Sequence, residues 1–530
     1  MFRGHPAGLK VLFFTEMWER FGYYLMIGIL SLYMLDTLTG GLGFPREKAA
    51  DIYGTFIALV YLTPFLGGIL ADRLLGYRKS VVIGGLLMAA GYMTLALPGD
   101  GSFYGGLGLI VFGNGFFKPN ISTIVGRLYP KGSPLRDTGY NIFYMGINIG
   151  AFVCNFVAAL LRNRFGWGWA FFAAGVGMLI GVLIFVTHQK YLRNAPDRGD
   201  GSAVQSGVLG QLLAQVLIPA LAAGVFGYFF LASVFGGATT AAFVAASIPV
   251  VIFYLLLWLR APRIEKGPIG ALLAIFSVVV VFWMIFHQNG STLTYWAEEN
   301  TRREAGAAAP VLRSLYLDQD ATIGESIPNP NAPGSYWRNV PENQRPPAGQ
   351  KVTLISTELF QSINPGFIIL FTPLVIWFFG YLRRRKREPS TPAKIAWGMF
   401  ITAASTIFML GAVAVSQGGQ LKVSPWWLVG TYGVITLGEL CLSPMGLALV
   451  SKLAPARVTA LMMGGWFLAT AIGNKLAGVL AEFWEKVPLM GIFGINFVAA
   501  VLAGIAIALM TPRVRRVMGE VEGRTTEQRL

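Results

Sequence analysis

Residues 11–26 read VLFFTEMWERFGYYLM, an apolar run interrupted by two acids and one base. At about 100° per helical residue, one face about 100° wide carries Glu16, Glu19, Arg20 and Tyr23. A charge at the centre of a bilayer costs at least roughly 2.5 kcal/mol, so such residues normally face a bundle interior or a hydrated cavity. The segment therefore predicts a membrane-spanning helix whose polar stripe belongs to a functional site.

The composition extends this prediction to the whole chain. The 530 residues are 54% hydrophobic and only 13% charged, which is far from the balance of soluble domains. Apolar runs of roughly 20 to 28 residues recur along the length, and each can cross about 30 Å of hydrocarbon as a helix. We count about fourteen such runs, which predicts an integral, all-α membrane protein in contact with the lipid bilayer.

The net charge of +16 does not indicate a nucleic-acid-binding protein. The basic residues gather in alternate loops, and the densest group is Arg383 to Arg387. If these loops are cytoplasmic, the positive-inside rule is satisfied with both termini in the cytoplasm. We therefore predict a multi-pass protein of a bacterial inner membrane.

The apolar runs divide into two large sets separated by a pair, which predicts two six-helix bundles joined by an inserted helical hairpin. The expected boundaries are 1–190 for the first bundle, 191–266 for the linker and hairpin, 267–512 for the second bundle and 513–530 for a cytoplasmic tail. Residues 291–353 form a long polar stretch rich in Pro, Asn, Gly and Ala. This composition favours an irregular loop on the outer side, with a substrate lid as the alternative.

A loop between two of the runs adds a first resemblance. Residues 67–79 read GGILADRLLGYRK and resemble the cytoplasmic loop signature of the major facilitator superfamily. This resemblance implies a fold of two six-helix halves, each built from inverted repeats, around a central cavity.

Further polar motifs follow the first helix in order. Residues 116–120 read FFKPN, residues 140–150 read YNIFYMGINIG and residues 438–444 read GELCLSP. Together with the stripe on the first helix, this ordered set resembles the signatures of the proton-dependent oligopeptide transporter family. The inserted hairpin is similar to that of bacterial members of the family.

The resemblance implies import of di- and tripeptides driven by protons, by alternating access and without a cofactor. It also implies a substrate site at the midplane between the halves of a protein that works as a monomer. A free dipeptide is a zwitterion, so its site needs a cation at one end and an anion at the other. Arg20 can bind the terminal carboxylate with two parallel hydrogen bonds, and Lys118 can add positive charge beside it. Glu439 suits the terminal ammonium.

Motif matching adds neighbours around these charges. It places hydrogen-bonding groups at Tyr23, Tyr61, Asn148 and Asn364, and a pocket aromatic at Trp466. Helix packing remains the alternative for Tyr61 and Trp466. For the charged residues of the site, the alternative is a buried structural ion network.

Proton coupling requires a carboxyl group whose proton affinity depends on its neighbours. Glu16 or Glu19 near Lys118 fits this need, and we expect protonation to free Lys118 and to weaken a link between helices. The two acids cannot be separated, since coupled sites titrate together. His287 is a further candidate, because imidazole titrates near pH 6.5, about the working range.

Three positions limit or extend these expectations. Many family members have a second Arg on the first helix where this chain has Ile27, and relatives commonly place a carboxylate near the His that corresponds to His287. Lys475 is expected to snorkel at the outer end of its helix, with a gate salt bridge as the alternative.

Other functional classes find less support. An enzyme is not predicted, because the chain has no His-Glu-x-x-His pair, no Cys/His metal cluster, no Walker loop and no Gly-x-Ser-x-Gly elbow. The closest alternative is a proton-coupled carrier of nitrate or another small organic anion on the same fold. A carboxylate at Glu439 argues against it, because it would repel a bare anion.

Overall fold

Long helices make up most of the chain. The computed structural model describes residues 2–71, 75–130, 133, 135–193, 195, 197, 213–235, 237–322, 335–455 and 458–527. Three residues of the loop signature, Asp72, Arg73 and Leu74, lie outside the described residues.

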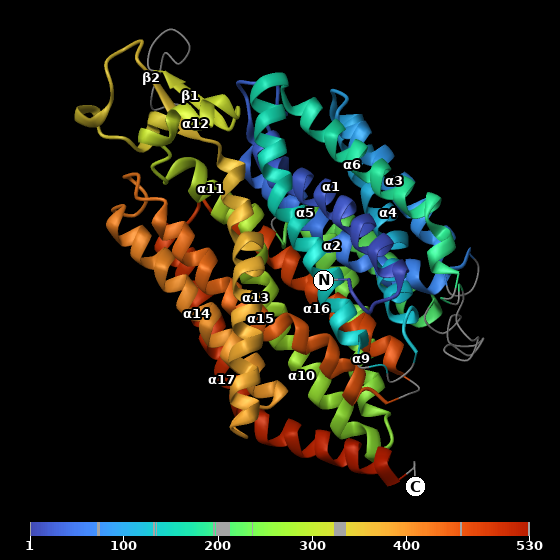
Figure 1. Cartoon of the computed structure of the whole chain (residues 1–530). Coiled ribbons are helices and arrows are strands. Elements are labelled where there is room, and N and C mark those ends of the chain that lie inside the picture. The colour runs from blue at the N-terminus through green and yellow to red at the C-terminus, as the bar shows by residue number, and fades with distance from the viewer. Residues whose placement is uncertain are drawn as a thin grey trace.

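The first bundle consists of six helices that share one hydrophobic core. They are α1 (Ala7–Leu35), α2 (Arg46–Leu70), α3 (Tyr77–Leu95), α4 (Asp100–Arg127), α5 (Leu135–Phe165) and α6 (Trp167–Thr187). These are the blue to cyan helices of Figure 1. Because the polar stripe of α1 faces inward, Glu16 and Glu19 are fully buried.

The second bundle packs around two further hydrophobic clusters, and α11 contributes residues to the second of them, against which α13 packs. Its helices are α10 (Arg263–Phe286), α11 (Thr292–Glu299), α13 (Ile363–Arg384), α14 (Thr391–Val415), α15 (Trp426–Leu453), α16 (Thr459–Glu482) and α17 (Leu489–Glu527). The two bundles lie side by side in Figure 1, and they contact one another through α2 with α16 and through α5 with α13.

An inserted hairpin stands between the bundles in the sequence. It consists of α8 (Ile218–Phe230), preceded by the short π-helical turn Leu213–Leu217, and α9 (Ala238–Leu259). Large apolar side chains such as Phe229 and Phe230 are about 70% exposed, as expected for a helix that faces lipid. The division of the chain into a first bundle (1–190), linker and hairpin (191–266), second bundle (267–512) and tail (513–530) remains a prediction.

Seven of the described helices are long and apolar enough to cross a membrane by length and composition. They include α6, α9 and α14, whereas α1 falls outside this set. The acids and the base inside α1 lower its mean hydropathy, which is the expected consequence of placing a polar site on a spanning helix.

The stretch after α11 is more ordered than its composition predicts. It contains α12 (Ala309–Ser314) and an antiparallel pair of strands, β1 (Asp318–Thr322) and β2 (Lys351–Ile355), in which Ala321 pairs with Val352. Tyr336 and Trp337 are 6% and 2% exposed and fill a small core of their own. The expectation of an irregular loop was therefore wrong for the described part of 291–353, because these aromatic residues supply an apolar core.

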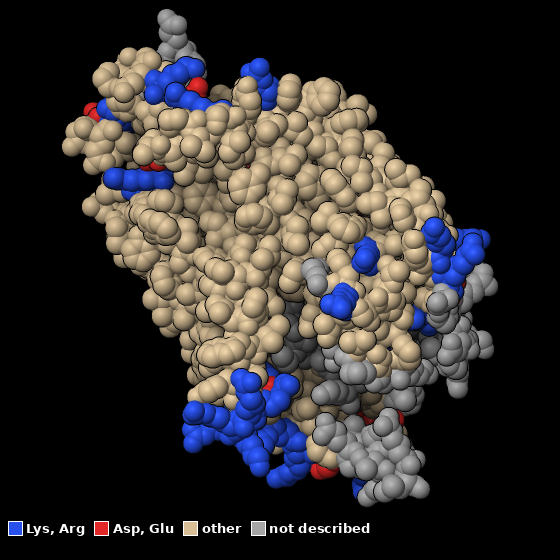
Figure 2. Space-filling view, in the orientation of Figure 1, with Lys and Arg blue, Asp and Glu red and all other residues tan. Residues whose placement is uncertain are grey.

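The two ends of the molecule differ in how the bundles meet. We call the end that carries β1 and β2 the loop end. The opposite end, where α13 ends within the basic run Arg383 to Arg387, is the basic end (Figures 1 and 2). At the loop end several polar contacts join the bundles. They are Lys475 with Asp51, Arg46 with Glu299, Lys486 with Glu47 (2.9 Å), Arg162 with Glu358 (2.8 Å), Asn155 with Ser362 (3.1 Å) and Ser31 with the carbonyl of Gly290 (2.6 Å). The loop end is therefore closed.

A glycine pair brings α2 and α16 into backbone contact at the loop end. A Cβ atom added to Gly54 would lie 2.7 Å from the Cα atom of Gly478, and a Cβ on Gly478 would lie equally close to Gly54. Since backbone atoms cannot rotate away, any side chain here must separate the helices.

Gly54→Ala is therefore expected to weaken the closed loop end. Overpacking of this kind costs about 1–3 kcal/mol, which exceeds the roughly 0.5–1 kcal/mol that Ala contributes over Gly in a helix. We expect a lower apparent melting temperature for the purified protein. Gly108→Ala in α4 is the matched control, because its Cβ meets nothing within 4 Å. If Gly54→Ala melts at the same temperature as this control, the added methyl group does not separate α2 from α16.

Candidate functional site

The polar stripe of α1 meets a lysine of α4 inside the first bundle. The Lys118 Nζ lies 2.5 Å from Glu16 Oε1, and the Arg20 Nε lies 3.3 Å from the same oxygen. Arg20 also forms an ion pair with Glu19, and its guanidinium lies over the ring of Tyr23, 5.0 Å from the centroid. The structure thus brings together five of the residues that the sequence singled out, on two helices.

Several atoms in this cluster keep unused bonding capacity. Within the described part of the chain, Glu16 Oε2, Glu19 Oε1 and Arg20 Nη2 are buried without a hydrogen-bond partner. Buried charged groups normally satisfy every donor and acceptor, because desolvation without a partner is costly. The cluster therefore has a free donor suited to an anion and free carboxylate oxygens suited to a proton.

A second polar group lies in the other bundle. The Asn364 Nδ2 of α13 donates to Glu439 Oε2 (3.1 Å) and to Thr436 Oγ1 (2.9 Å), both on α15. Glu439 is 6% exposed. Tyr144 of α5 lies close enough to interact with this carboxylate, so the group reaches the first bundle.

Two tyrosines connect the two groups. Tyr24 of α1 and Tyr61 of α2 each lie within electrostatic range of both Arg20 and Glu439. The cationic group of one bundle and the carboxylate of the other therefore border the same region. Opposite charges from the two bundles thus act on the same two tyrosines.

An aromatic group covers one side of Tyr61. Its ring centroid lies 5.6 Å from that of His287 and 6.5 Å from that of Trp283, and these two rings are 4.9 Å apart. His287 follows α10 and is 9% exposed, and its Nδ1 is buried without a partner among the described residues. The structure thus places His287 beside Tyr61, in an aromatic setting.

The remaining two predicted residues, Trp466 and Asn148, lie on α16 and α5. Trp466 of α16 packs against Phe276 of α10, with ring centroids 6.4 Å apart, and against Gly446 of α15. The Asn148 side chain donates to the carbonyl of Tyr144 one helical turn earlier (2.9 Å). For Trp466 the described contacts are those of the packing alternative.

Three neighbours were not among the predicted site residues, namely Tyr24, Tyr144 and Trp283. Tyr24 follows Arg20 by four positions on α1, and Tyr144 precedes Asn148 by four positions on α5. Residues four apart share a helix face. Helical spacing from the residues already chosen could therefore have found both tyrosines.

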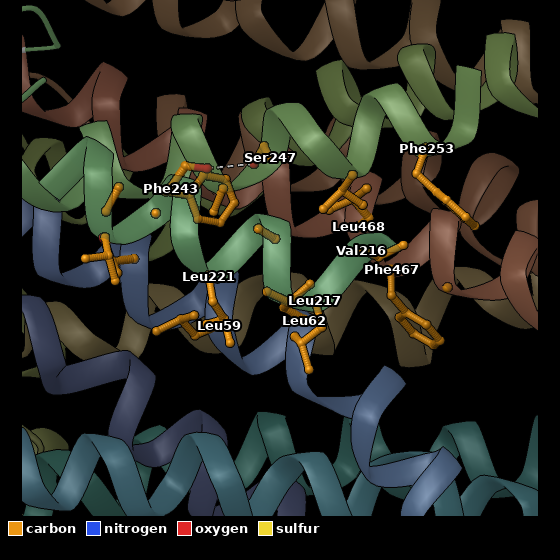
Figure 3. Close-up of a pocket in the computed structure, with 18 of the residues that line it drawn as sticks. Leu59, Leu62, Val216, Leu217, Leu221, Phe243, Ser247, Phe253, Phe467 and Leu468 are labelled. Atoms are coloured by element: carbon orange, nitrogen blue, oxygen red, sulfur yellow. Dashed lines mark hydrogen bonds between the residues drawn. The ribbon is translucent and has the colours of Figure 1, made fainter. Parts of the chain in front are cut away.

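A large cavity lies elsewhere, between the inserted hairpin and the two bundles. It measures about 620 Å³, and its lining includes Leu59 of α2, Leu221 of α8, Phe243 of α9 and Phe467 of α16 (Figure 3). The lining is almost wholly apolar, and the Ser247 hydroxyl within it is bonded to the carbonyl of Phe243 (2.8 Å). None of the described lining residues carries a charge that could pair with a charged ligand. In the described part of the chain, no cluster of three His, Cys, Asp or Glu could hold a metal ion.

Comparison with known proteins finds relatives along nearly the whole chain. A model of the POT family matches residues 78–311 and 350–496. A peptide transporter of Yersinia enterocolitica is 32% identical, covering 99% of this chain and 98% of its own. A di-/tripeptide transporter of Lactococcus lactis subsp. cremoris is 30% identical over 98% of each chain. A crystal structure of a mutant peptide transporter POT in complex with alafosfalin has a TM-score of 0.77 at 33% identity, covering 98% of this chain and 97% of its own.

Proposed function

This chain belongs to the proton-dependent oligopeptide transporter family of the major facilitator superfamily, and from that premise we propose that it imports di- and tripeptides together with protons by alternating access. The observation that carries the proposal is the pair of opposite charges, Arg20 and Glu439, on two bundles around the same tyrosines. The names of the relatives support the substrate class, since one is a peptide transporter and another a di-/tripeptide transporter.

The charges suit the two ends of a short peptide. The free Nη2 of Arg20 can donate to the terminal carboxylate, and Lys118, whose side chain is 28% exposed, adds a second positive charge. Glu439 accepts the terminal ammonium while Asn364 holds the carboxylate in place. Because only main-chain ends are gripped, side chains can vary.

The remaining predicted residues form the surroundings of these charges. We assign Tyr23, Tyr61 and Asn148 to hydrogen bonding around the peptide. We assign Trp466 a supporting role next to the site, through its packing against Phe276 of α10.

The proton is carried by the acid pair of α1. Glu16 Oε1 accepts from Lys118 and forms an ion pair with Arg20, whose Nε donates to Glu19. Protonation at Glu16 removes the acceptor of Lys118 and frees this ammonium to face the peptide, whereas protonation at Glu19 releases Arg20 from its ion pair. Since α1 and α4 belong to the same bundle, the effect on bundle rocking passes through the freed charge rather than through a broken link between the bundles.

The positive-inside rule supports placing the loop end outside the cell and both termini in the cytoplasm of a bacterium. The closed loop end then excludes the outward-open state of the transport cycle. The proton gradient is the driving force, and the cycle needs neither a cofactor nor a catalytic step. One chain carries both charged groups, so the monomer is the functional unit.

Proteoliposomes test the proposed function directly. Purified protein is supplied with labelled dialanine, nitrate or alanine, with and without an inward proton gradient. We expect accumulation of dialanine only with the gradient. Accumulation of nitrate without dialanine would favour the anion carrier instead, although Glu439 disfavours a bare anion.

The pH profile of uptake tests His287 separately. If this imidazole exchanges a proton during the cycle, His287→Ala will move the acid limb of the profile, because one titrating group is removed. Tyr61→Phe is the control, since it alters the neighbouring ring without removing a group that titrates near neutral pH. An unchanged profile for His287→Ala would leave the residue a packing role beside Trp283.

A further inference from the structure

The first turn of α9 contacts the junction between the two bundles. The Thr239 hydroxyl donates to Asp51 Oδ2, and the Thr240 hydroxyl donates to Asp51 Oδ1 (3.3 Å). Asp51 lies on α2 of the first bundle and forms an ion pair with Lys475 on α16 of the second bundle. Three parts of the chain thus meet at one carboxylate.

Lys475 depends on this junction for its partners. The residue is 1% exposed, and its ammonium donates to Asp51 and to Thr55 Oγ1 (2.8 Å). The expectation that Lys475 snorkels was therefore wrong, because the backbone contact of Gly54 with Gly478, one turn away, encloses the side chain. An ammonium buried this deeply is stable only while its carboxylate partner remains in place.

The rest of the hairpin packs loosely on the bundles. The apolar cavity of about 620 Å³ separates it from α2 and α16 over much of its length, with Thr55 and Thr239 in the lining (Figure 3). At the other end, the Tyr254 hydroxyl donates to the carbonyl of Leu461 on α16 (2.7 Å). Directed contacts between hairpin and bundles therefore concentrate at its two ends, and one of them is the Asp51 junction.

We propose that the inserted hairpin positions Asp51 for its ion pair with Lys475 and so stabilises the closed loop end of the transporter. Thr239 and Thr240 are positioning residues, since they act on the bundles through Asp51. The inference rests on the proposed alternating access and assigns the hairpin a role in it.

The physical reason is that Asp51 accepts from both sides. Two hydroxyls hold its oxygens from the hairpin side while Lys475 approaches from α16. A hydrogen bond to a charged group contributes more than one between neutral groups, and it fixes the orientation of the carboxylate. Without the hydroxyls the carboxylate gains rotational freedom, so the ion pair between the bundles weakens and the loop end opens more often.

A buried thiol at the loop end reports this opening. Ser31 is 1% exposed and donates to the carbonyl of Gly290 across the bundles, so Ser31→Cys places a thiol behind the closed contacts. A membrane-impermeant maleimide added to intact cells labels it only while the loop end is open. The full-length protein without Ser31→Cys gives the background from Cys154 and Cys441, both of which are buried.

Labelling is compared among variants that all carry Ser31→Cys. We expect Thr239→Val with Thr240→Val to raise the labelling rate about fivefold, and Lys475→Gln, which removes the ion pair itself, to raise it at least as much. Thr239→Ser with Thr240→Ser keeps both hydroxyls and should restore the original rate. Ser247→Ala is the matched control, since its hydroxyl bonds within α9.

The proposal is overturned if the double Val variant labels at the original rate, or if Ser247→Ala labels equally fast. It is also overturned if Lys475→Gln leaves the rate unchanged, because the ion pair would then not hold the loop end. Failure of the proposed function would look different: dialanine uptake by the original protein would be absent, whatever the labelling rates.

Discussion

Replacing Glu16 and Glu19 together with Gln is expected to abolish gradient-driven accumulation of dialanine while leaving counterflow intact. Glutamine keeps the shape of glutamate and an acceptor oxygen, but it cannot take up or release a proton at physiological pH. Both acids are fully buried, and both contact Arg20, so the substitution leaves a neutral pair beside two cations. Transport would then run only down the peptide gradient.

The size of the effect follows from the gradient applied. With the membrane potential held at zero, a pH difference of one unit stores about 1.4 kcal/mol per proton, which supports about tenfold accumulation. The double variant should show no accumulation above the equilibrium level. Exchange of labelled dialanine against unlabelled dialanine should persist, because counterflow needs no net proton movement.

Two comparisons make this result specific. Glu342→Gln removes an exposed carboxylate from the loop region and should leave accumulation unchanged. Each single variant, Glu16→Gln or Glu19→Gln, shows which acid is indispensable, a question that helical spacing leaves open. Persistent tenfold accumulation in the double variant would place the coupling proton elsewhere in the chain.

The stripe on α1 could be predicted because it depends on one helix only. Glu16, Glu19, Arg20 and Tyr23 share a face by helical geometry, and the structure keeps them together. The meeting of Glu16 with Lys118, 102 positions away, required a family motif as well. Helical spacing alone therefore predicted the residues of α1, whereas Lys118 was added through the resemblance to the family.

The Asp51–Lys475 junction could not be predicted in the same way. Neither residue lies in a motif, and their contact depends on the backbone approach of Gly54 to Gly478. A lysine near a helix end is compatible with snorkelling until the neighbouring helix is placed. Contacts between helices depend on packing register, which one sequence does not specify.

The ordered structure of β1, β2 and the described residues between them could not be predicted from the sequence, for a related reason. Residues 291–353 are rich in Pro, Asn, Gly and Ala, a composition that usually indicates irregular structure. Tyr336 and Trp337 gain their burial only when β1 pairs with β2 and closes over them. A few large aromatic side chains can therefore organise a stretch whose average composition argues against order.

Glu439→Gln is expected to weaken dialanine binding by about 30- to 100-fold. The substitution removes the negative charge that we assign to the peptide ammonium but keeps an oxygen for Asn364, which lies 3.1 Å away. Loss of a charged partner of this kind costs about 2–3 kcal/mol in binding. Equilibrium binding to the purified protein measures the change.

Acetylating the peptide amino group isolates the charge interaction from other effects of the substitution. The original protein should bind N-acetyl-dialanine much more weakly than dialanine, whereas Glu439→Gln should bind the two with similar affinity. Each protein thus gives one difference in binding free energy, that between dialanine and N-acetyl-dialanine. Subtracting the value for Glu439→Gln from the value for the original protein gives the free energy of pairing between Glu439 and the ammonium. If Glu439→Gln still prefers dialanine over N-acetyl-dialanine as strongly as the original protein does, the ammonium binds elsewhere. The opposite charges of Arg20 and Glu439 would then not explain the binding of a zwitterionic peptide.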